Sequence, residues 1–197
     1  MRRLLLKSVV QRPLTEPAPP KDDAALAELA ARLDQASRRK LGRALAIREV
    51  DAGSCNGCEL EIHALANVLY DLERFGLRFV ASPRHADVLL VTGPVTTNMR
   101  EALERTYQAT PDPKWVVAVG DCARNGGVFA GSRACVGGGV AAVLPVDLHI
   151  PGCPPSPTAL LGGLLALLES ASTDLPDRKS TRLNSSHIQK SRMPSSA

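Results

Sequence analysis

Long apolar runs that end in turn residues restrict the fold of this chain more than any other feature. The runs ADVLLVTGPV, WVVAVGDC and AAVLPVDLHIPGC are almost unbroken, as expected for strands covered on both faces of a sheet. LAIREV and LRFVA precede them, and helical segments separate the runs. Such alternation favours right-handed crossovers between parallel strands. We therefore predict an α/β fold, a flavodoxin-like three-layer domain with a mostly parallel sheet.

Four segments have the pattern of helices. The first, DDAALAELAARLDQASRRKL, opens on acidic residues, and the last is PTALLGGLLALLES. Residues 98–108 also have a helical pattern. Between the first two strands we predict a long helix, from about Glu59 to Phe75. Its expected buried stripe consists of Ile62, Leu65, Ala66, Leu69 and Leu72.

The composition along the chain divides it into three parts. Residues 1–43 form a Pro-rich arm and a helix, and residues 44–176 form the main domain, which we expect to hold a single core. Residues 177–197, DRKSTRLNSSHIQKSRMPSSA, have no apolar periodicity and resemble the translation of a common DNA-sequencing adapter. We treat this last part as non-native, so that the natural C-terminus is expected to have been lost near Pro176; the alternative is a disordered basic tail.

The formal net charge of +4 is concentrated in that last part. It holds five of the 24 basic residues but only Asp177 of the 20 acidic ones, which leaves 19 of each elsewhere. A neutral body gives no electrostatic reason to expect a nucleic-acid partner.

Neither a membrane span nor an export signal is predicted. No stretch reaches the roughly 18 to 20 apolar residues that cross a bilayer. The start, MRRLLLKSVVQRPL, superficially resembles a twin-arginine signal, but Lys7 breaks its apolar run and Pro13 helps to end it. We expect a cytoplasmic chain that is at most peripheral to a membrane.

Cysteines follow the predicted strands. Cys55, Cys58, Cys122 and Cys153 each lie just after a strand, and parallel strands end at one edge of a sheet. These thiols are therefore expected to converge there. Five cysteines without a secretory signal favour metal ligation over disulfides. One 4Fe-4S cluster is the preferred group, and zinc stays an alternative, although zinc sites usually pair two close CxxC knuckles.

The residues around these cysteines suit a buried cluster. Asn56 and Gly57 form a tight turn, while Gly120 and Gly152 allow close backbone approach. Pro154 fixes the outgoing chain. We interpret Cys135 as a packing residue and Gly137 to Gly139 as a turn. His149 is interpreted as structural or as tuning the cluster by a hydrogen bond. Glu59 is interpreted as a helix-start residue, with proton movement near the cluster as the weaker alternative.

The motifs CNGC, GDC and GCP resemble the ligand pattern of the small subunits of NiFe hydrogenases. SPRHADVLLVTGPVT and PVDLHIPGCPPSP extend the similarity to the B-type subunit of complex I and to energy-converting hydrogenases, over about residues 44–170. QRPLTEPAPP is similar to the N-terminus of the formate-hydrogenlyase type. The B-type subunit of complex I has two adjacent cysteines, whereas two residues separate Cys55 from Cys58 here, and this favours the hydrogenase branch.

The resemblance implies an oxidoreductase subunit of a membrane-associated complex. It implies a 4Fe-4S cluster on the four cysteines named above, electron transfer as the role, and no catalytic side chain, flavin or nicotinamide on this chain. The implied partners are a large catalytic subunit, similar to the D-type subunit of complex I, a ferredoxin-like subunit and membrane-arm subunits on the cytoplasmic side. The alternatives are the B-type subunit of an NADH-quinone oxidoreductase or of a related complex without hydrogenase activity, a zinc-stabilised interaction module, and a flavin-binding flavodoxin relative.

Overall fold

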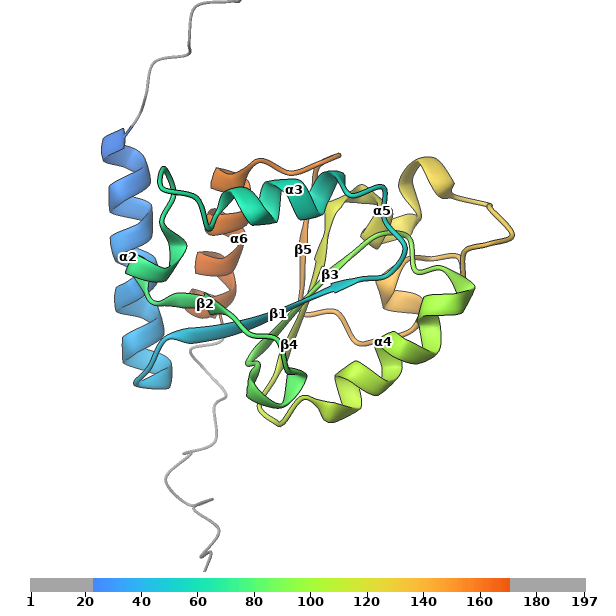
Figure 1. Ribbon diagram of the computed structural model, residues 1–197, viewed down its shortest axis with the longest axis horizontal. Coiled ribbons are helices and arrows are strands. Elements are labelled where there is room, and N and C mark those ends of the chain that lie inside the picture. Colours follow the sequence, from blue (N-terminus) through green and yellow to red (C-terminus); the bar gives the residue numbers. More distant parts are fainter. Residues whose placement is uncertain (1–22, 171–197) are drawn as a thin grey trace, which may run out of the picture.

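The computed structural model describes residues 23–170, which form one parallel sheet with helices on both faces (Figure 1). The strand order is β2-β1-β3-β4-β5, and every neighbouring pair is parallel. This is the flavodoxin-like order 2-1-3-4-5. The strands are β1 (Leu45–Asp51), β2 (Leu77–Phe79), β3 (Val88–Thr92), β4 (Trp115–Val119) and β5 (Leu148–Ile150). The predicted α/β, flavodoxin-like fold is confirmed.

Two apolar clusters fill the space between the sheet and its helices. On one face lie α2 (Asp23–Leu41), α3 (Gly57–Ala64) and α6 (Pro157–Ser170), which contribute Leu33, Ile62 and Leu164 to the first cluster. On the other face lie α4 (Thr97–Ala109) and α5 (Gly120–Asn125), with Leu103 and Ala123 in the second. Figure 1 shows α2 beside α6, at the opposite end of the molecule from α4. All three layers of the prediction are therefore present.

Short 3-10 helices fill several connections between these elements. They are η1 (Leu72–Phe75), η2 (Pro83–His85), η3 (Gly127–Phe129) and η4 (Val140–Ala142). Within residues 23–170, no helix is both long enough and apolar enough to span a membrane. The Pro-rich arm and the adapter-like tail predicted from the sequence lie outside the described residues.

The long helix predicted from Glu59 to Phe75 is wrong in length, because α3 ends at Ala64. The Asn67 side chain accepts hydrogen bonds from the backbone N–H groups of Leu69 and Tyr70, at 2.9 and 3.1 Å, and so forms a turn instead of another helical turn. The predicted stripe is accordingly broken. Its first, second and last members are buried, whereas two in the middle are exposed: Ile62, Leu65 and Leu72 are buried, and Ala66 and Leu69 are exposed.

Candidate metal centre

The loop after β1 is held by side-chain hydrogen bonds before the first cysteine. Asp51 Oδ1 accepts hydrogen bonds from the backbone N–H groups of Gly53 and Ser54, at 2.7 and 2.8 Å. Ser54 Oγ then accepts one from the N–H of Asn56 at 3.0 Å. Asn56 has a φ of 69°, a left-handed conformation that asparagine tolerates, and it is the N-cap of α3. The CNGC segment thus turns sharply at the carboxyl end of β1.

Cys122 and Cys153 are placed by the ends of the neighbouring strands β4 and β5. Cys122 lies in α5, a short helix that starts directly after β4. Two hydrogen bonds tie this segment to the loop after β5: the Asp121 N–H donates to Gly152 O at 2.9 Å, and the Gly152 N–H donates to Asp121 Oδ1 at 3.1 Å. The two cysteines therefore follow segments that are fixed to each other.

The thiol groups of the four predicted cysteines interact electrostatically. Burial raises the pKa of Cys58 to about 12, and Glu59, Cys122, Cys55 and Cys153 raise it further by their negative charge. Because the charges of Cys55, Cys122 and Cys153 all affect the pKa of Cys58, the four thiols lie close to one another at the carboxyl edge of the sheet. A thiol of such high pKa is protonated at neutral pH, so that binding of a cationic metal there must release a proton.

Cys122 is the most buried of the four and has a polar contact of its own. Burial raises its pKa, whereas a hydrogen bond from the backbone N–H of Val128 lowers it, and the nearby Cys153 and Cys55 raise it. Such an N–H group stabilises negative charge on sulfur, which is what a metal-bound thiolate carries.

Glycines are packed against two of the sulfur atoms. A Cβ at Gly120 would lie 2.7 Å from Cys58 Sγ, and a Cβ at Gly127 would lie 2.9 Å from Cys122 Sγ. Both glycines also have positive φ angles, 84° and 49°. The backbone can approach the sulfurs closely only because these side chains are missing. The thiols therefore lie in a cradle that a larger residue would fill.

The donor set and its spacing bear on which group could bind. Thiolates are soft ligands that suit iron–sulfur clusters and zinc. Within residues 23–170, no group of three or more His, Cys, Asp or Glu side chains is arranged to hold a single metal ion. Cys55 and Cys153 are exposed, Cys58 is half-buried and Cys122 is buried. Thiol groups at this edge are the soft donors that an iron–sulfur cluster, the group expected from the sequence, would require.

The other residues that the sequence singled out lie apart from the thiols or act on the backbone. Cys135 pairs with Thr96 in an isolated antiparallel bridge and is not among the groups that shift the pKa of Cys58 or Cys122. His149 Nε2 lies 3.1 Å from the carbonyl oxygen of Gly120, so its hydrogen bond is made to the backbone before Cys122. The residues from 137 to 139 form a loop, as predicted.

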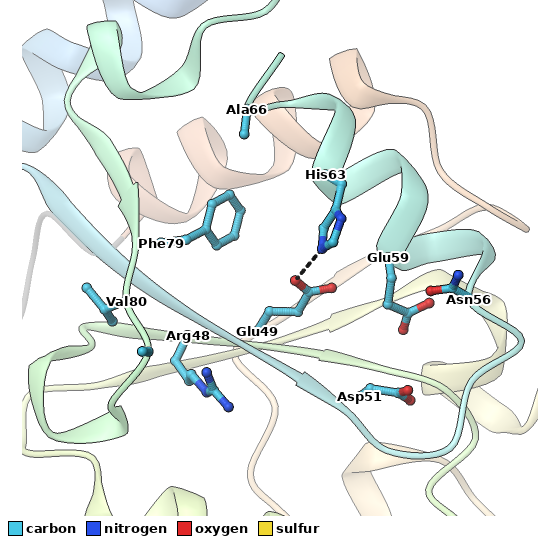
Figure 2. Close-up of a pocket in the computed structure, with 10 residues that line it drawn as sticks. Arg48, Glu49, Asp51, Asn56, Glu59, His63, Ala66, Phe79 and Val80 are labelled. Atoms are coloured by element: carbon cyan, nitrogen blue, oxygen red, sulfur yellow. Dashed lines mark ion pairs between the residues drawn. The ribbon is translucent and has the colours of Figure 1, made fainter.

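A polar pocket beside the cysteine loop was not anticipated from the sequence. Figure 2 shows Glu49 and Asp51 of β1 facing His63 and Glu59 of α3 across it. The sequence suggested a helix-start residue at Glu59, yet this residue is only 7% exposed. The charged residues of LAIREVD could have indicated this pocket, because charged residues are unusual in a strand of a sheet whose two faces are both covered.

Together, the fold and the site define a flavodoxin-like α/β protein with thiols gathered at the carboxyl edge of its sheet. Residues 55–167 match the family described as NADH ubiquinone oxidoreductase, 20 Kd subunit. The chain therefore belongs to this family, whose members are oxidoreductase subunits of hydrogenase-type and complex-I-type assemblies. The resemblance drawn from the cysteine motifs is confirmed.

Individual relatives come from both branches of the family. Formate hydrogenlyase subunit 7 of Escherichia coli is 46% identical over 156 residues, which are 78% of this chain and 59% of that protein. The chain thus spans less than two thirds of that relative. The B-type subunit of the NADH-quinone oxidoreductase of Citrifermentans bemidjiense is 46% identical over 117 residues, which are 59% of this chain and 68% of that protein.

A solved structure supports the same fold. One chain of the membrane-bound sulfane sulfur reductase, an archaeal respiratory membrane complex, superposes with a TM-score of 0.58 at 36% identity. The match covers 69% of this chain and 72% of the other.

Proposed function

We propose that this chain is an electron-transfer subunit that carries one 4Fe-4S cluster on Cys55, Cys58, Cys122 and Cys153. When bound, the cluster would take up and release one electron at a time. The chain's own residues would hold it and tune it through hydrogen bonds. No side chain of this subunit is needed as a base or nucleophile.

The observation that carries the proposal is the gathering of these four thiols, with glycines pressed against the sulfurs. Cys58 senses the charges of the other three, and Gly120 leaves no room for a side chain beside Cys58 Sγ. In an open parallel sheet, ligands bind outside the carboxyl ends of the strands. The Val128 N–H that donates to Cys122 is the kind of contact that raises a cluster's potential by stabilising the reduced, more negative form.

Exposed apolar side chains next to the site support docking on a larger catalytic subunit. Val128 is 80% exposed and Phe129 38% exposed, and both belong to the segment that donates to Cys122. Leu60 of α3, two residues after Cys58, is 61% exposed. An apolar partner surface would cover these residues and bring an electron donor or acceptor close to the cluster. Ferredoxin-like and membrane-arm subunits, on the cytoplasmic side, would complete the complex.

Within the family, we place this chain in a complex-I-like NiFe hydrogenase of the formate-hydrogenlyase type. Identity alone does not decide, since both named relatives are 46% identical. The spacing of Cys55 and Cys58 favours the hydrogenase branch, and the E. coli relative matches a larger share of this chain. The alternative is the B-type subunit of an NADH-quinone oxidoreductase. Co-expression with the neighbouring large subunit and an assay for hydrogen separates the two.

The test of the cluster itself is anaerobic iron, sulfide and zinc analysis, combined with EPR of the dithionite-reduced protein. Near four iron and four sulfide per chain are expected in the wild type and in Cys135→Ala. Cys122→Ala, and Cys55→Ala at an exposed position, should lose the reduced-cluster signal. Stoichiometric zinc without sulfide would replace the proposal by a zinc-stabilised interaction module.

A further inference from the structure

A cavity of about 710 Å³ lies between β1, α3 and the segment after β2 (Figure 2). Its lining residues come from β1, the cysteine loop, α3 with the turn after it, and the end of β2 with the segment that follows: Arg48, Glu49, Asp51, Asn56, Glu59, His63, Ala66, Phe79, Val80 and Ala81. Asn56 stands between two proposed cluster ligands and Glu59 directly follows one, so the pocket shares a wall with the candidate metal centre.

Negative charge dominates this lining. It contains three carboxylates, those of Glu49, Asp51 and Glu59, against the single guanidinium of Arg48. His63 Nε2 lies 3.9 Å from Glu49 Oε2, and it is charged only when protonated. Burial raises the pKa of the Glu49 carboxyl, and the negative charges of Glu59 and Asp51 raise it further, against the opposing effects of His63 and Arg48. The pocket therefore favours a cationic occupant.

Several polar groups in the wall lack hydrogen-bond partners. Glu59 is 7% exposed, and neither of its carboxylate oxygens has a hydrogen-bond partner among the described residues. Glu49 Oε1 and Arg48 Nε are likewise buried without one. Asp51 differs, because its Oδ1 already accepts hydrogen bonds from two backbone N–H groups. Buried carboxylates without donors are strongly disfavoured, so that a donor from outside the described residues is expected at Glu49 and Glu59.

We propose that this pocket receives an arginine side chain of a neighbouring subunit, whose guanidinium donates to Glu49 and Glu59. The inference rests on the proposed role of the chain as a subunit of a larger complex. A guanidinium presents several N–H donors in one plane and can serve two carboxylates together. The ring of Phe79, which lines the same cavity, offers an apolar face on which a guanidinium can stack.

The proposed contact would also steady the candidate metal centre. Glu59 follows Cys58 on α3, and Asn56 forms the turn between Cys55 and Cys58. An arginine seated on Glu59 would hold the first turn of α3 and thereby the CNGC loop. Docking of the partner would thus fix the loop that carries half of the proposed ligands.

The pocket is tested on the full chain with Nα-acetyl-arginine amide as the probe and the neutral Nα-acetyl-citrulline amide as its control. Calorimetry at constant ionic strength should give a dissociation constant of about 1 mM for the arginine probe, as expected for a ligand of this size. Glu49→Gln should weaken binding at least about tenfold, since a charged hydrogen bond is lost. Glu61→Gln, on α3 but outside the pocket lining, should bind like the wild type. Equal binding of the two probes, no saturable binding, or no effect of Glu49→Gln would overturn the proposal.

The partner is tested by co-expression with the large subunit. Glu49→Arg places a positive charge in the pocket, which would repel the partner's arginine, and should reduce co-purification of the large subunit severalfold. Glu61→Arg, outside the pocket lining, should not reduce it. Equal retention in both variants would contradict an arginine of that subunit as the occupant. Iron and sulfide in the same samples report on the cluster separately. A chain that contains four iron atoms but does not bind the arginine probe would refute only the proposed arginine site. A chain that binds the probe but contains no iron would refute only the proposed cluster.

Discussion

Asp121 and Gly152 exchange two hydrogen bonds across the carboxyl ends of β4 and β5, at 2.9 and 3.1 Å. Each residue stands directly before a cysteine of the candidate metal centre. These two hydrogen bonds hold the segment that carries Cys122 against the segment that carries Cys153. The pairing of β4 with β5 thus positions two of the proposed ligands.

Replacing Asp121 by Ala removes the side-chain acceptor and leaves the Gly152 N–H without its partner. We expect a loss of about 1 to 2 kcal/mol in the free energy of unfolding and a lower iron content per chain. Asp121→Asn keeps an acceptor oxygen and should lose less of both. Urea denaturation and iron analysis measure the two effects. Iron content equal to wild type in Asp121→Ala would show that the pair does not position the ligands.

Gly120→Ala tests the space beside Cys58. The new Cβ would lie 2.7 Å from Cys58 Sγ and 3.3 Å from Gly152 O, and Gly120 has a φ of 84°, which alanine rarely adopts. We expect most of the bound iron and sulfide to be lost. Gly162→Ala on α6 is the control, because no atom outside the neighbouring backbone of its own helix lies within 4 Å of the new Cβ, and alanine favours a helix. Full iron content in Gly120→Ala would mean that the cradle is not needed.

A parallel, flavodoxin-like sheet could be predicted from the apolar runs of the sequence. The edge of the sheet to which the cysteines belong could be predicted because parallel strands all end there. Cys122 and Cys153 are far apart in sequence from Cys55, yet strand ends alone bring them to one edge. Neither the side-chain partners of Asp121 nor the short helix α5 could be predicted from a pattern, since both depend on contacts between distant segments.

The failures of sequence reasoning have local causes. Apolar periodicity favoured a helix through Leu69, but the Asn67 side chain captured backbone N–H groups there and a turn resulted. Helix-start placement explained Glu59 adequately, and only the folded chain reveals that its carboxylate is buried beside Glu49. Burial of a charged group is a tertiary property, so a one-dimensional pattern does not predict it.

Asp87 is a second buried carboxylate, at the amino ends of the strands and far from the cysteines. Its side chain is 1% exposed, and it accepts hydrogen bonds from Arg43 Nη2 at 2.6 Å and from the Ala46 N–H at 3.1 Å. Asp87→Ala should lower the free energy of unfolding by roughly 3 kcal/mol, because it leaves the Ala46 N–H buried and unpaired. Asp87→Asn keeps an acceptor and should cost less. Urea denaturation of both variants checks this order, which equal losses would contradict.

Glu49 should make the stability of the chain depend on pH. Burial raises its pKa in the folded state, with Glu59 and Asp51 adding to the effect and His63 and Arg48 opposing it. Above the pKa of an unfolded glutamate, about 4.3, the folded chain therefore binds more protons at this position than the unfolded chain.

Since the excess proton is bound by the folded state, the contribution of Glu49 to stability is fully present below that pH and is lost as the pH rises through the raised pKa. Glu49→Gln cannot titrate and lacks this loss. The free energy of unfolding of the variant, relative to wild type, should therefore increase from about pH 4 to pH 8. Urea denaturation of both proteins across that range measures it. A difference that stays constant with pH would contradict the raised pKa, and one that falls with pH would mean that the Glu49 carboxyl is stabilised in its charged form, as an occupied pocket would require.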